Sequence, residues 1–544
     1  MTQTEEFTPQ QEAILQRFVT NPKDSIFALY NLPEVIKGAL FSRYSRSTFG
    51  LRTLLLREFM TNDEEANFQD LTGFGEQGPS QEQLLAIKKA QNFYDRILDG
   101  YGDDSIGELG GTHLAIENIS MLAAKAIEEC RIGGSPLEKS TRYIYFDQKV
   151  RGEYLFHKEA IIMTSAWKEL YLNTCNMLFD TYSRLIPTLT TFMTTKYPRD
   201  PDTSTQAYTA TIRAKVLDCV RGLLPASALT NVGLFGNGRF FEGLLHKLQG
   251  QNLAELRDIG RRSYLELEKV IPSFVRRAEW NHKTHLSFLK FYEQMRSELK
   301  TIAHTVQSPQ KPDTNAYVRL VTADTYAPVK VAAALLYQYS NASFEETLTY
   351  CHSLSEDELA KIFEAASSYR EHRRHKSPRG LENALYTFEI LADFGSYRDL
   401  QRHRILTQDR QLLSCNHGYY VPQEIIESGL EAEYRTAMKM AKEAYDIIAN
   451  DLIEEAQYIV PMAYHIRWYM TINLRSLQWL TELRSQAAGH PSYRGIAQKM
   501  AHQIIDTHPI FQRFFSFVNY DHAEEGRLQQ EIHAEQKQSS SLVE

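Results

Sequence analysis

The chain has 544 residues, of which 43% are hydrophobic, and its formal net charge is −8. A chain of that length is too long to fold around one ordinary hydrophobic core, so we expect two large domains. The negative charge excludes a general attraction to nucleic acid. The sequence has no run of about eighteen apolar residues, so it predicts no membrane span.

The N-terminal residues MTQTEEFTPQQEA are polar and acidic, without the basic start and apolar centre of an export signal. Five cysteines are scattered along the chain and form no Cys-x-x-Cys pair, which argues against a zinc site and a disulfide framework. His372 and His375 have helical spacing for a metal, but the basic run YREHRRHKSPRG around them would repel a cation. The sequence therefore predicts a cytoplasmic protein without a metal site.

Helical periodicity dominates the chain, whereas strand signals are few and short. The segment EAEYRTAMKMAKEAYDIIANDLIEEAQYIV places five apolar residues on one helix face: Ala437, Ala441, Ala444, Ile448 and Leu452. Strands are expected at YIYF from Tyr143 and at YVRLV from Tyr317. The fold class predicted from these patterns is a helix-rich α+β protein.

The densest group of cationic side chains is Arg402, His403 and Arg404 in QRHRILTQDRQLLS. Consecutive residues at a helix end point in different directions, so all three converge only on a large, multiply charged anion. A dinucleotide or a cluster of phosphates has that character. A solvated basic turn is the alternative interpretation of an isolated triplet.

Two pairs of segments indicate an internal repeat. LENALYTFEILADFGSYRDLQ, before the triplet, resembles THLAIENISMLAAKAIEEC, which precedes the loop SPLEKSTRYIYFD. RGLLPASALTNVGLFGNGRFFEGLLHKL and QYIVPMAYHIRWYMTINLRSLQWLTELR both place Pro twelve residues before Asn-x-Arg. The matching residues are Pro225, Asn237 and Arg239 in the first segment and Pro461, Asn473 and Arg475 in the second. Agreement of two windows in the same order favours two tandem copies of one domain.

Composition sets the limits of the two copies. The stretch QSPQKPDTNA from Gln307 holds two prolines and several turn formers, which is typical of a connection between domains. We therefore expect a first repeat over residues 1–306, a linker over 307–316 and a second repeat over 317–522. Residues 523–544 are polar and poor in aromatic side chains, which predicts a tail.

These motifs resemble the flavin-dependent thymidylate synthase family. The resemblance rests on RDLQRHRILT with NLRSLQWLTELRSQAAGHPSYRGIAQKM, and on EKSTRY in the first half, and it covers most of residues 100–250 and 315–515. It implies FAD-dependent reductive methylation of dUMP to dTMP, with methylenetetrahydrofolate as carbon donor and NADPH as reductant. The predicted enzyme class is accordingly a methyltransferase.

The resemblance assigns the FAD site to the second repeat. The residues that match the family's flavin-binding positions are Ser377, Arg402, His403, Arg404, Asn473, Arg475 and His490. The second repeat departs from the family signature after the triplet, where Leu412 and Ser414 replace a serine and an arginine. It therefore lacks the nucleotide-loop half of the motif.

The first repeat has the opposite defect, because Cys130, Arg131 and Ile132 occupy the place of the triplet. Its loop keeps the family's nucleotide residues, and Leu248 and Gln457 each stand where the other copy has an arginine. The residues matched to substrate binding are Glu138, Ser140, Arg142 and Arg221 of the first repeat and Arg484 of the second. The resemblance implies catalytic roles for Arg484 and Ser140.

Because each copy lacks what the other retains, we expect both to contribute side chains to one shared flavin site. Fixed guanidinium groups suit pyrophosphate, the nucleotide phosphate and negative charge that develops on the pyrimidine carbonyls. Two chains as a homodimer would rebuild the family's tetramer as a pseudo-tetramer. The complementary losses leave two alternatives open, namely a degenerate flavin- or nucleotide-binding scaffold, and a reductive methylase of another pyrimidine nucleotide whose base pocket is reshaped by Leu412 and Ser414.

Overall fold

The computed structural model describes most of the chain in two compact units. The described residues are 7–44, 47, 49–59, 107–130, 132–201, 203–306, 312–521, 528 and 531–532. Most of the predicted 523–544 tail, residues 307–311 of the predicted linker, and Arg131 therefore lie outside them. Unit 1 comprises residues 1–117, 130–138 and 231–307, and unit 2 comprises 118–129, 139–230 and 308–544. The compact units thus do not follow the repeat limits, because part of the first repeat folds with the second.

Unit 1 is built around most of a three-stranded sheet of order β1-β5-β2, formed by β1 (Gly111–Ser120), β2 (Gly134–Glu138) and β5 (Leu229–Asn237). Strand β2 pairs antiparallel with β5 from Gly134 opposite Gly236 to Glu138 opposite Val232. The helices among the described residues of unit 1 are α1 (Pro9–Leu15), α2 (Glu34–Tyr44), α3 (Leu51–Leu54), the π-helix Leu55–Phe59, α9 (Gly238–Gln249), α10 (Ala254–Val270), α11 (Pro272–Val275), the 3-10 helix Arg276–Ala278 and α12 (Lys283–Ala303). Helix α9 packs against α10 and α11 through Leu244, Leu245 and Leu248, which are fully buried.

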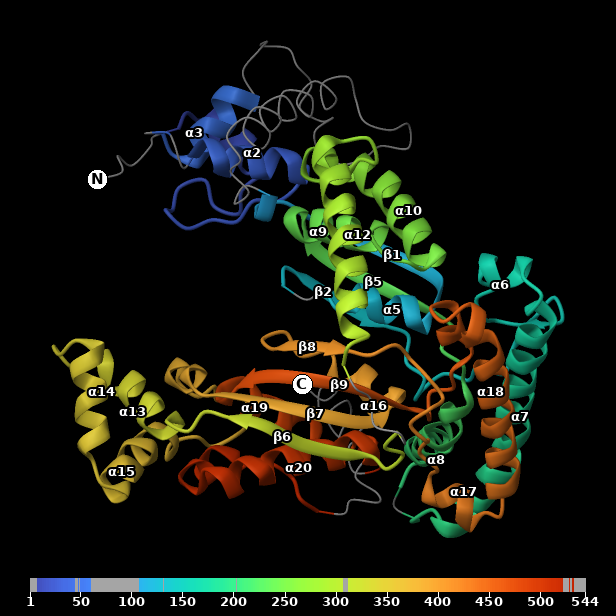
Figure 1. Cartoon of the computed structure of the whole chain (residues 1–544). Coiled ribbons are helices and arrows are strands. Elements are labelled where there is room, and N and C mark those ends of the chain that lie inside the picture. Colours follow the sequence, from blue (N-terminus) through green and yellow to red (C-terminus); the bar gives the residue numbers. More distant parts are fainter. Residues whose placement is uncertain are drawn as a thin grey trace. The chain divides into compact units, whose positions relative to one another are not determined.

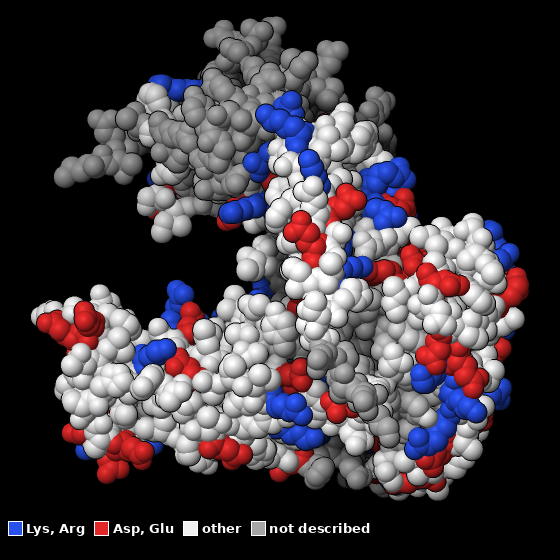
Figure 2. All heavy atoms as spheres, in the orientation of Figure 1, with Lys and Arg blue, Asp and Glu red and all other residues white. Residues whose placement is uncertain are grey.

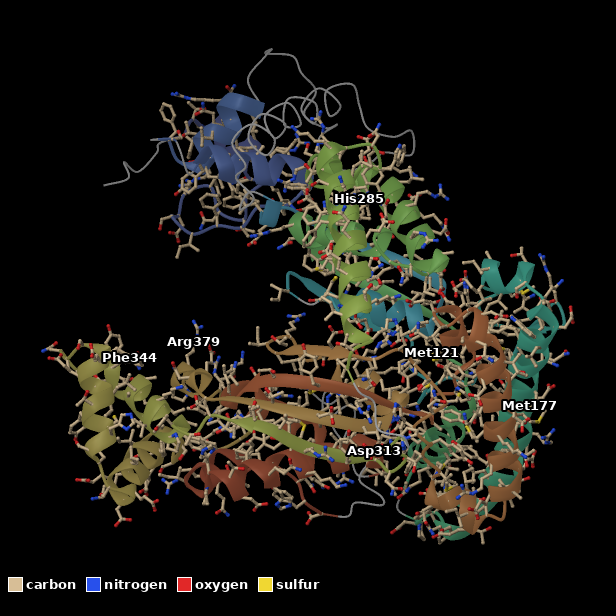
Figure 3. All side chains as sticks on the ribbon, viewed as in Figure 1. Met121, Met177, His285, Asp313, Phe344 and Arg379 are labelled. Carbon is tan, nitrogen blue, oxygen red and sulfur yellow. The ribbon has the colours of Figure 1, made fainter. Side chains whose placement is uncertain are left out.

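A buried histidine pair joins α9 to α12 in unit 1. His246 Nδ1 lies 2.7 Å from Nδ1 of His285, which is labelled on α12 in Figure 3. His285 Nε2 lies 3.1 Å from Gln249 Oε1. Because an amide oxygen only accepts, His285 carries its proton on Nε2, and its Nδ1 accepts from His246. The His285 ring is therefore neutral in this arrangement.

The histidine pair predicts an acid-sensitive stability. Burial, with the charges of His285, Arg277 and His282, lowers the pKa of His246 to about 4. Since the ordinary pKa of histidine is near 6.5, the contribution to stability is complete above pH 6.5 and is lost as pH falls toward 4. We expect the urea-unfolding free energy to fall by about 2 to 3 kcal/mol over that range. The variant His246→Phe should flatten the dependence, and His304→Gln, at the exposed end of α12, should not; a His246→Phe profile as steep as the wild type would contradict this.

Unit 2 contains a four-stranded antiparallel sheet of order β6-β7-β9-β8 (Figure 1). Its strands are β6 (Tyr317–Ala323), β7 (Leu385–Asp393), β8 (Thr407–Arg410) and β9 (His465–Asn473). The strand predicted from YVRLV is confirmed as β6. The strand predicted from YIYF is wrong, because residues 143–146 form a turn and coil in which the Phe146 amide donates to the Tyr182 hydroxyl at 3.3 Å.

Helices cover this sheet and extend from both of its ends. The helices of unit 2 are α5 (Met121–Glu128), α6 (Ala160–Thr164), α7 (Lys168–Lys196), α8 (Thr205–Val220), α13 (Ala327–Tyr337), α14 (Phe344–Ser353), α15 (Glu356–Ser367), α16 (Phe394–Leu400), α17 (Gln423–Glu427), α18 (Glu431–Asp451), α19 (Leu474–Arg484) and α20 (Pro491–Thr507). Short 3-10 helices occupy Arg221–Leu223, Arg379–Asn383, Glu455–Ile459 and Pro509–Phe515, and a small hairpin pairs β3 (Lys149–Val150) with β4 (Glu153–Tyr154).

Helix α18 confirms the apolar face that its periodicity predicts. Ala437, Ala441, Ala444 and Ile448 are buried, whereas Leu452 lies just beyond the helix as its C-terminal cap. The helix packs beside α7, as Figure 1 shows. On the outer surface of this pair, Figure 2 shows basic and acidic side chains interspersed. Such exposed pairs contribute little to stability individually, about 1 kcal/mol or less.

The two repeats meet in unit 2 at a seam centred on Pro225 and Pro461, which form a β-bridge with each other. The backbone hydrogen bonds across this seam come in matched pairs. Ala226 donates to Val460 and Met462 to Leu224, while Ser227 donates to Tyr458 and Ala463 to Gly222, all at 2.9 Å. Exchanging each residue for its counterpart in the other repeat converts one bond of a pair into the other. The seam is therefore a local pseudo-twofold axis, and this geometry matches the predicted duplication.

The same symmetry sets the register of the helices beside the seam. The amides of Met121 and Leu122, at the start of α5, donate to the carbonyls of Ala228 and Ala226. In the other repeat, Phe394 and Gly395, at the start of α16, donate to Tyr464 and Met462. Ser120 and Asp393 cap these helices by accepting from an amide three residues later. Leu122 is therefore the structural counterpart of Gly395.

Candidate anion-binding site

Arginines from both repeats converge in unit 2 around one carboxylate, Asp399 of α16. Arg221 Nη1 lies 3.8 Å from Asp399 Oδ2, and Arg484 Nη1 lies 4.0 Å from Asp399 Oδ1. Both separations are too long for hydrogen bonds. Burial would raise the pKa of Asp399, but the charges of Arg221, Arg484, Arg402 and Arg142 outweigh it and lower that pKa. The first repeat thus supplies Arg142 and Arg221, and the second supplies Arg402 and Arg484.

Arg142 is clamped by Asp218 near the end of α8. Its Nε and Nη2 donate to the two oxygens of Asp218, both at 2.7 Å, in a bidentate pair. Its remaining donors reach the Tyr493 hydroxyl and the Ala488 carbonyl, each at 3.3 Å. Burial opposes ionisation of Asp218, yet the charge and hydrogen bonds of Arg142 lower its pKa to about 2. The Arg142 guanidinium is therefore held rigidly by protein groups.

The backbone of the same loop is fixed by Ser140, whose hydroxyl accepts from the Arg142 amide at 3.2 Å. Ser140 is half-buried and lies in unit 2. Glu138 is the buried last residue of β2 and belongs to unit 1. The predicted nucleotide loop thus passes from one compact unit to the other between Glu138 and Ser140.

His403 is the residue of the triplet that contacts the arginines around Asp399. Arg484 Nε donates to His403 Nε2 at 3.1 Å, so that nitrogen carries no proton and the imidazole is neutral, protonated on Nδ1. His403 is buried, whereas Arg402 and Arg404 are exposed. Burial lowers the pKa of Arg484 below its usual range, with the Arg402 charge contributing in the same direction. His403 Nε2 can accept from Arg484 only while this nitrogen carries no proton, so the contact requires neutral His403.

His490, at the start of α20, contacts α8 beside the arginines around Asp399. Its Nδ1 accepts from the Ser492 amide at 3.2 Å, so its proton lies on Nε2, which faces the Asp218 carbonyl oxygen at 3.3 Å. Burial and the charge of Arg221 lower the pKa of His490 to about 4. Both ring nitrogens of His490 thus contact backbone groups.

Two adjoining hollows open beside these residues, with volumes of about 70 Å³ and 10 Å³. Both are lined by Asp218, Cys219, Tyr420, Pro422 and His490. The larger one reaches Arg142 and Lys215, and the smaller one reaches Arg221 and Asp393. Arg221 is only 4% exposed, and its Nη2 has no hydrogen-bond partner among the described residues. A buried guanidinium with an unused donor is costly unless an anion completes it.

The other predicted flavin residues lie at the opposite end of α19 from Arg484. Asn473 caps the helix by accepting from the Ser476 amide at 2.8 Å. Arg475 donates to the Ser377 carbonyl and to Glu382, each at 2.8 Å. The Ser377 hydroxyl is buried without a hydrogen-bond partner among the described residues. This end therefore has one orphaned hydroxyl and one partly used guanidinium.

Sequence reasoning missed the carboxylates of the site. Asp218 precedes Arg221 by three residues, and Asp399 precedes Arg402 by three. That spacing places each acid one helical turn before a predicted anion-binding arginine, which was an available signal. Asp393 was missed too, and it fixes α16 against α20 through hydrogen bonds with Ser396 and Ser492.

The described residues include neither a candidate membrane-crossing helix nor a candidate metal cluster. No helix there combines the length and apolar character that crossing a bilayer requires. No cluster of three or more His, Cys, Asp or Glu side chains there has an arrangement that could hold a metal ion.

Together, the fold and the site define a duplicated, helix-rich α+β protein in which arginines of both repeats lie beside two adjoining hollows. The family model described as thymidylate synthase complementing protein matches residues 60–273 and 319–510. The chain belongs to this family, which confirms the resemblance derived from the motifs. The two matched segments fall inside the two predicted repeats.

Relatives of similar length extend the comparison. The chain is 52% identical over 531 residues to a UPF0159 protein of Chlamydia pneumoniae, covering 98% of each chain. It is 32% identical over 522 residues to a UPF0159 protein of Thermoplasma acidophilum, covering 91% of this chain and 98% of the relative. Among solved structures, a UMP/dUMP methylase of Streptomyces cacaoi with bound 5-Br dUMP has 17% identity and a TM-score of 0.31, covering 38% of this chain and 98% of its own.

Proposed function

We propose that this protein methylates dUMP to dTMP reductively, with FAD as cofactor, methylenetetrahydrofolate as carbon donor and NADPH as reductant. The observation that carries the proposal is the buried Arg221 guanidinium, whose Nη2 has no hydrogen-bond partner in the part of the chain that the structure describes and faces a hollow shared by both repeats. Family membership supports a nucleotide as the anion. We assign the phosphate of dUMP to this guanidinium, with Arg402 and Arg484 adding positive charge across Asp399.

Each side chain has a separate task in this proposal. Arg142 shapes the nucleotide loop, because Asp218 and Tyr493 fix its guanidinium in place. Arg484 stabilises negative charge that develops on a pyrimidine carbonyl, and His403 orients it by accepting from its Nε. Ser140 supplies a hydroxyl beside the base.

The residues near Ser377 and the triplet fit a flavin dinucleotide. The buried Ser377 hydroxyl, without a hydrogen-bond partner among the described residues, offers a donor to a ribityl chain, and the guanidinium charges of Arg402, Arg404 and Arg475 suit a pyrophosphate. When bound, the flavin supplies the reducing equivalents for the transferred carbon. Asn473 retains its amide nitrogen for such a contact, since only its oxygen caps α19.

The test is a direct assay of the purified chain. We expect yellow protein with a flavin spectrum that, given NADPH and methylenetetrahydrofolate, releases tritium from C5 of labelled dUMP. Colourless protein that does not bind dUMP would favour the scaffold alternative. Yellow protein that oxidises NADPH and methylates UMP, but not dUMP, would instead favour the alternative pyrimidine acceptor.

A further inference from the structure

The pseudo-twofold seam creates two equivalent positions, and their residues differ systematically. On one side lie Arg221, Gly222 and Gly395, which line the smaller hollow. Their counterparts on the other side are Gln457, Tyr458 and Leu122, as the paired hydrogen bonds of the seam establish. A cation and two glycines on one side thus correspond to an amide and two bulky side chains on the other.

The side with the two glycines is open, because neither of these positions carries a side chain. A Cβ at Gly395 would lie 3.0 Å from Asp393 Oδ1 and 3.4 Å from Arg221 Nη2, so a larger residue would displace the guanidinium. A Cβ at Gly222 would collide with the Tyr434 hydroxyl. The absence of a side chain at Gly395 therefore keeps Arg221 Nη2 open to the hollow, and at Gly222 it leaves room for the Tyr434 hydroxyl, whose residue also lines the hollow.

The opposite side is filled and its polar groups are satisfied. Tyr458 and Leu122 are fully buried, and the Tyr458 ring lies 5.0 Å from that of His157. Gln457 Oε1 accepts from the Leu413 amide at 3.1 Å, and its Nε2 donates to the Glu454 carbonyl at 2.9 Å. This amide uses its groups on protein partners, whereas Nη2 of the equivalent Arg221 has no hydrogen-bond partner among the residues described.

We infer that each chain carries one nucleotide site at this seam, on the Arg221 side, and that the pseudo-equivalent Gln457 side is permanently plugged by Tyr458 and Leu122. Gly222 and Gly395 are the positioning residues that keep the working side open. The nucleotide as occupant rests on the proposed function, whereas the asymmetry of the two sides rests on the seam alone. Of the two equivalent positions that the duplication created, one is thus a binding site and the other is a packed region of the core.

Calorimetric titration of the full chain with dUMP tests this stoichiometry. We expect one dUMP per chain, at least tenfold weaker binding in Arg221→Gln and Gly395→Leu, and affinity within twofold of wild type in Gln457→Ala. The last variant is the matched control at the other side of the seam, and thermal melts establish that each variant is folded. Two nucleotides per chain, or an Arg221→Gln variant that keeps a full-affinity site, would overturn the inference.

A halide probe separates this inference from the proposed function. Crystals of the full chain soaked in bromide should show an anion beside Arg221 and none beside Gln457. If dUMP does not bind at all, the proposed function fails, and the bromide positions alone then decide the asymmetry. Bromide beside Gln457, or its absence beside Arg221, would refute the plugged-site inference.

Discussion

Replacing Asp218 by Asn is expected to lower the free energy of unfolding by about 3 to 5 kcal/mol at neutral pH, because it leaves Arg142 as a buried cation without a counter-charge. The two side chains form a bidentate pair and are only 12% and 14% exposed. Since the pKa of Asp218 is lowered to about 2, its contribution is present above pH 4 and is lost as pH falls through 4 toward 2.

Urea unfolding of the two proteins between pH 7 and pH 3 measures this effect. The difference between wild type and Asp218→Asn should shrink below pH 4, because the Asp218 carboxylate of the unfolded wild-type chain takes up a proton there, whereas the folded one, with its pKa near 2, stays ionised. The matched control is Asp446→Asn, because Asp446 pairs with Lys442 at 2.8 Å on the exposed face of α18. That control should cost about 1 kcal/mol or less. An Asp218→Asn variant no less stable than Asp446→Asn would show that the pair of Asp218 with Arg142 contributes little to the free energy of unfolding.

Replacing Arg484 by Lys is expected to reduce turnover of dUMP by about 100- to 1000-fold, the effect typical of removing one preorganised donor from a developing negative charge. Its guanidinium has its Nε held by His403 and its Nη1 turned toward Asp399. The three donors of a lysine all lie on one nitrogen, so it cannot keep the His403 contact and also place a donor where Arg484 Nη1 lies. The turnover number should fall more than KM rises, because the interaction strengthens as the reaction proceeds.

Tritium release from labelled dUMP under saturating conditions measures this loss. Arg239→Lys provides the control, since Arg239 is an exposed arginine at the start of α9, paired with Glu108 at 2.7 Å. It should retain turnover within twofold. A loss of less than threefold in Arg484→Lys would remove Arg484 from the chemistry and leave it a role in binding only.

Much of the fold was predictable from the sequence because repeats and helical periodicity are local signals. Helix α18, strand β6 and the two copies were recognised in this way. The division into compact units was not, because it depends on which strands of the first repeat pair with each other. The strand expected at Tyr143 does not form, for a similar reason. The backbone of that segment makes a tertiary hydrogen bond to the Tyr182 hydroxyl.

The candidate site was only partly predictable. Motif matching selected the arginines that converge on Asp399, since their identity is visible in the sequence. It could not reveal that Arg142 is already paired with Asp218, or that His490 directs both ring nitrogens at the backbone. The roles of Gly222 and Gly395 were also hidden, because a glycine acts there through the space it leaves open.

In the proposed arrangement, arginines from the two repeats of a single chain build one nucleotide site. Co-expression of Arg221→Gln and Arg484→Gln chains in a thymidine-requiring bacterium tests whether both arginines act from the same chain. We predict no growth without thymidine, because neither variant chain holds a complete arginine cluster, while either variant co-expressed with wild type grows. Growth of the doubly variant strain would mean that Arg221 and Arg484 act from different chains, which would contradict the account.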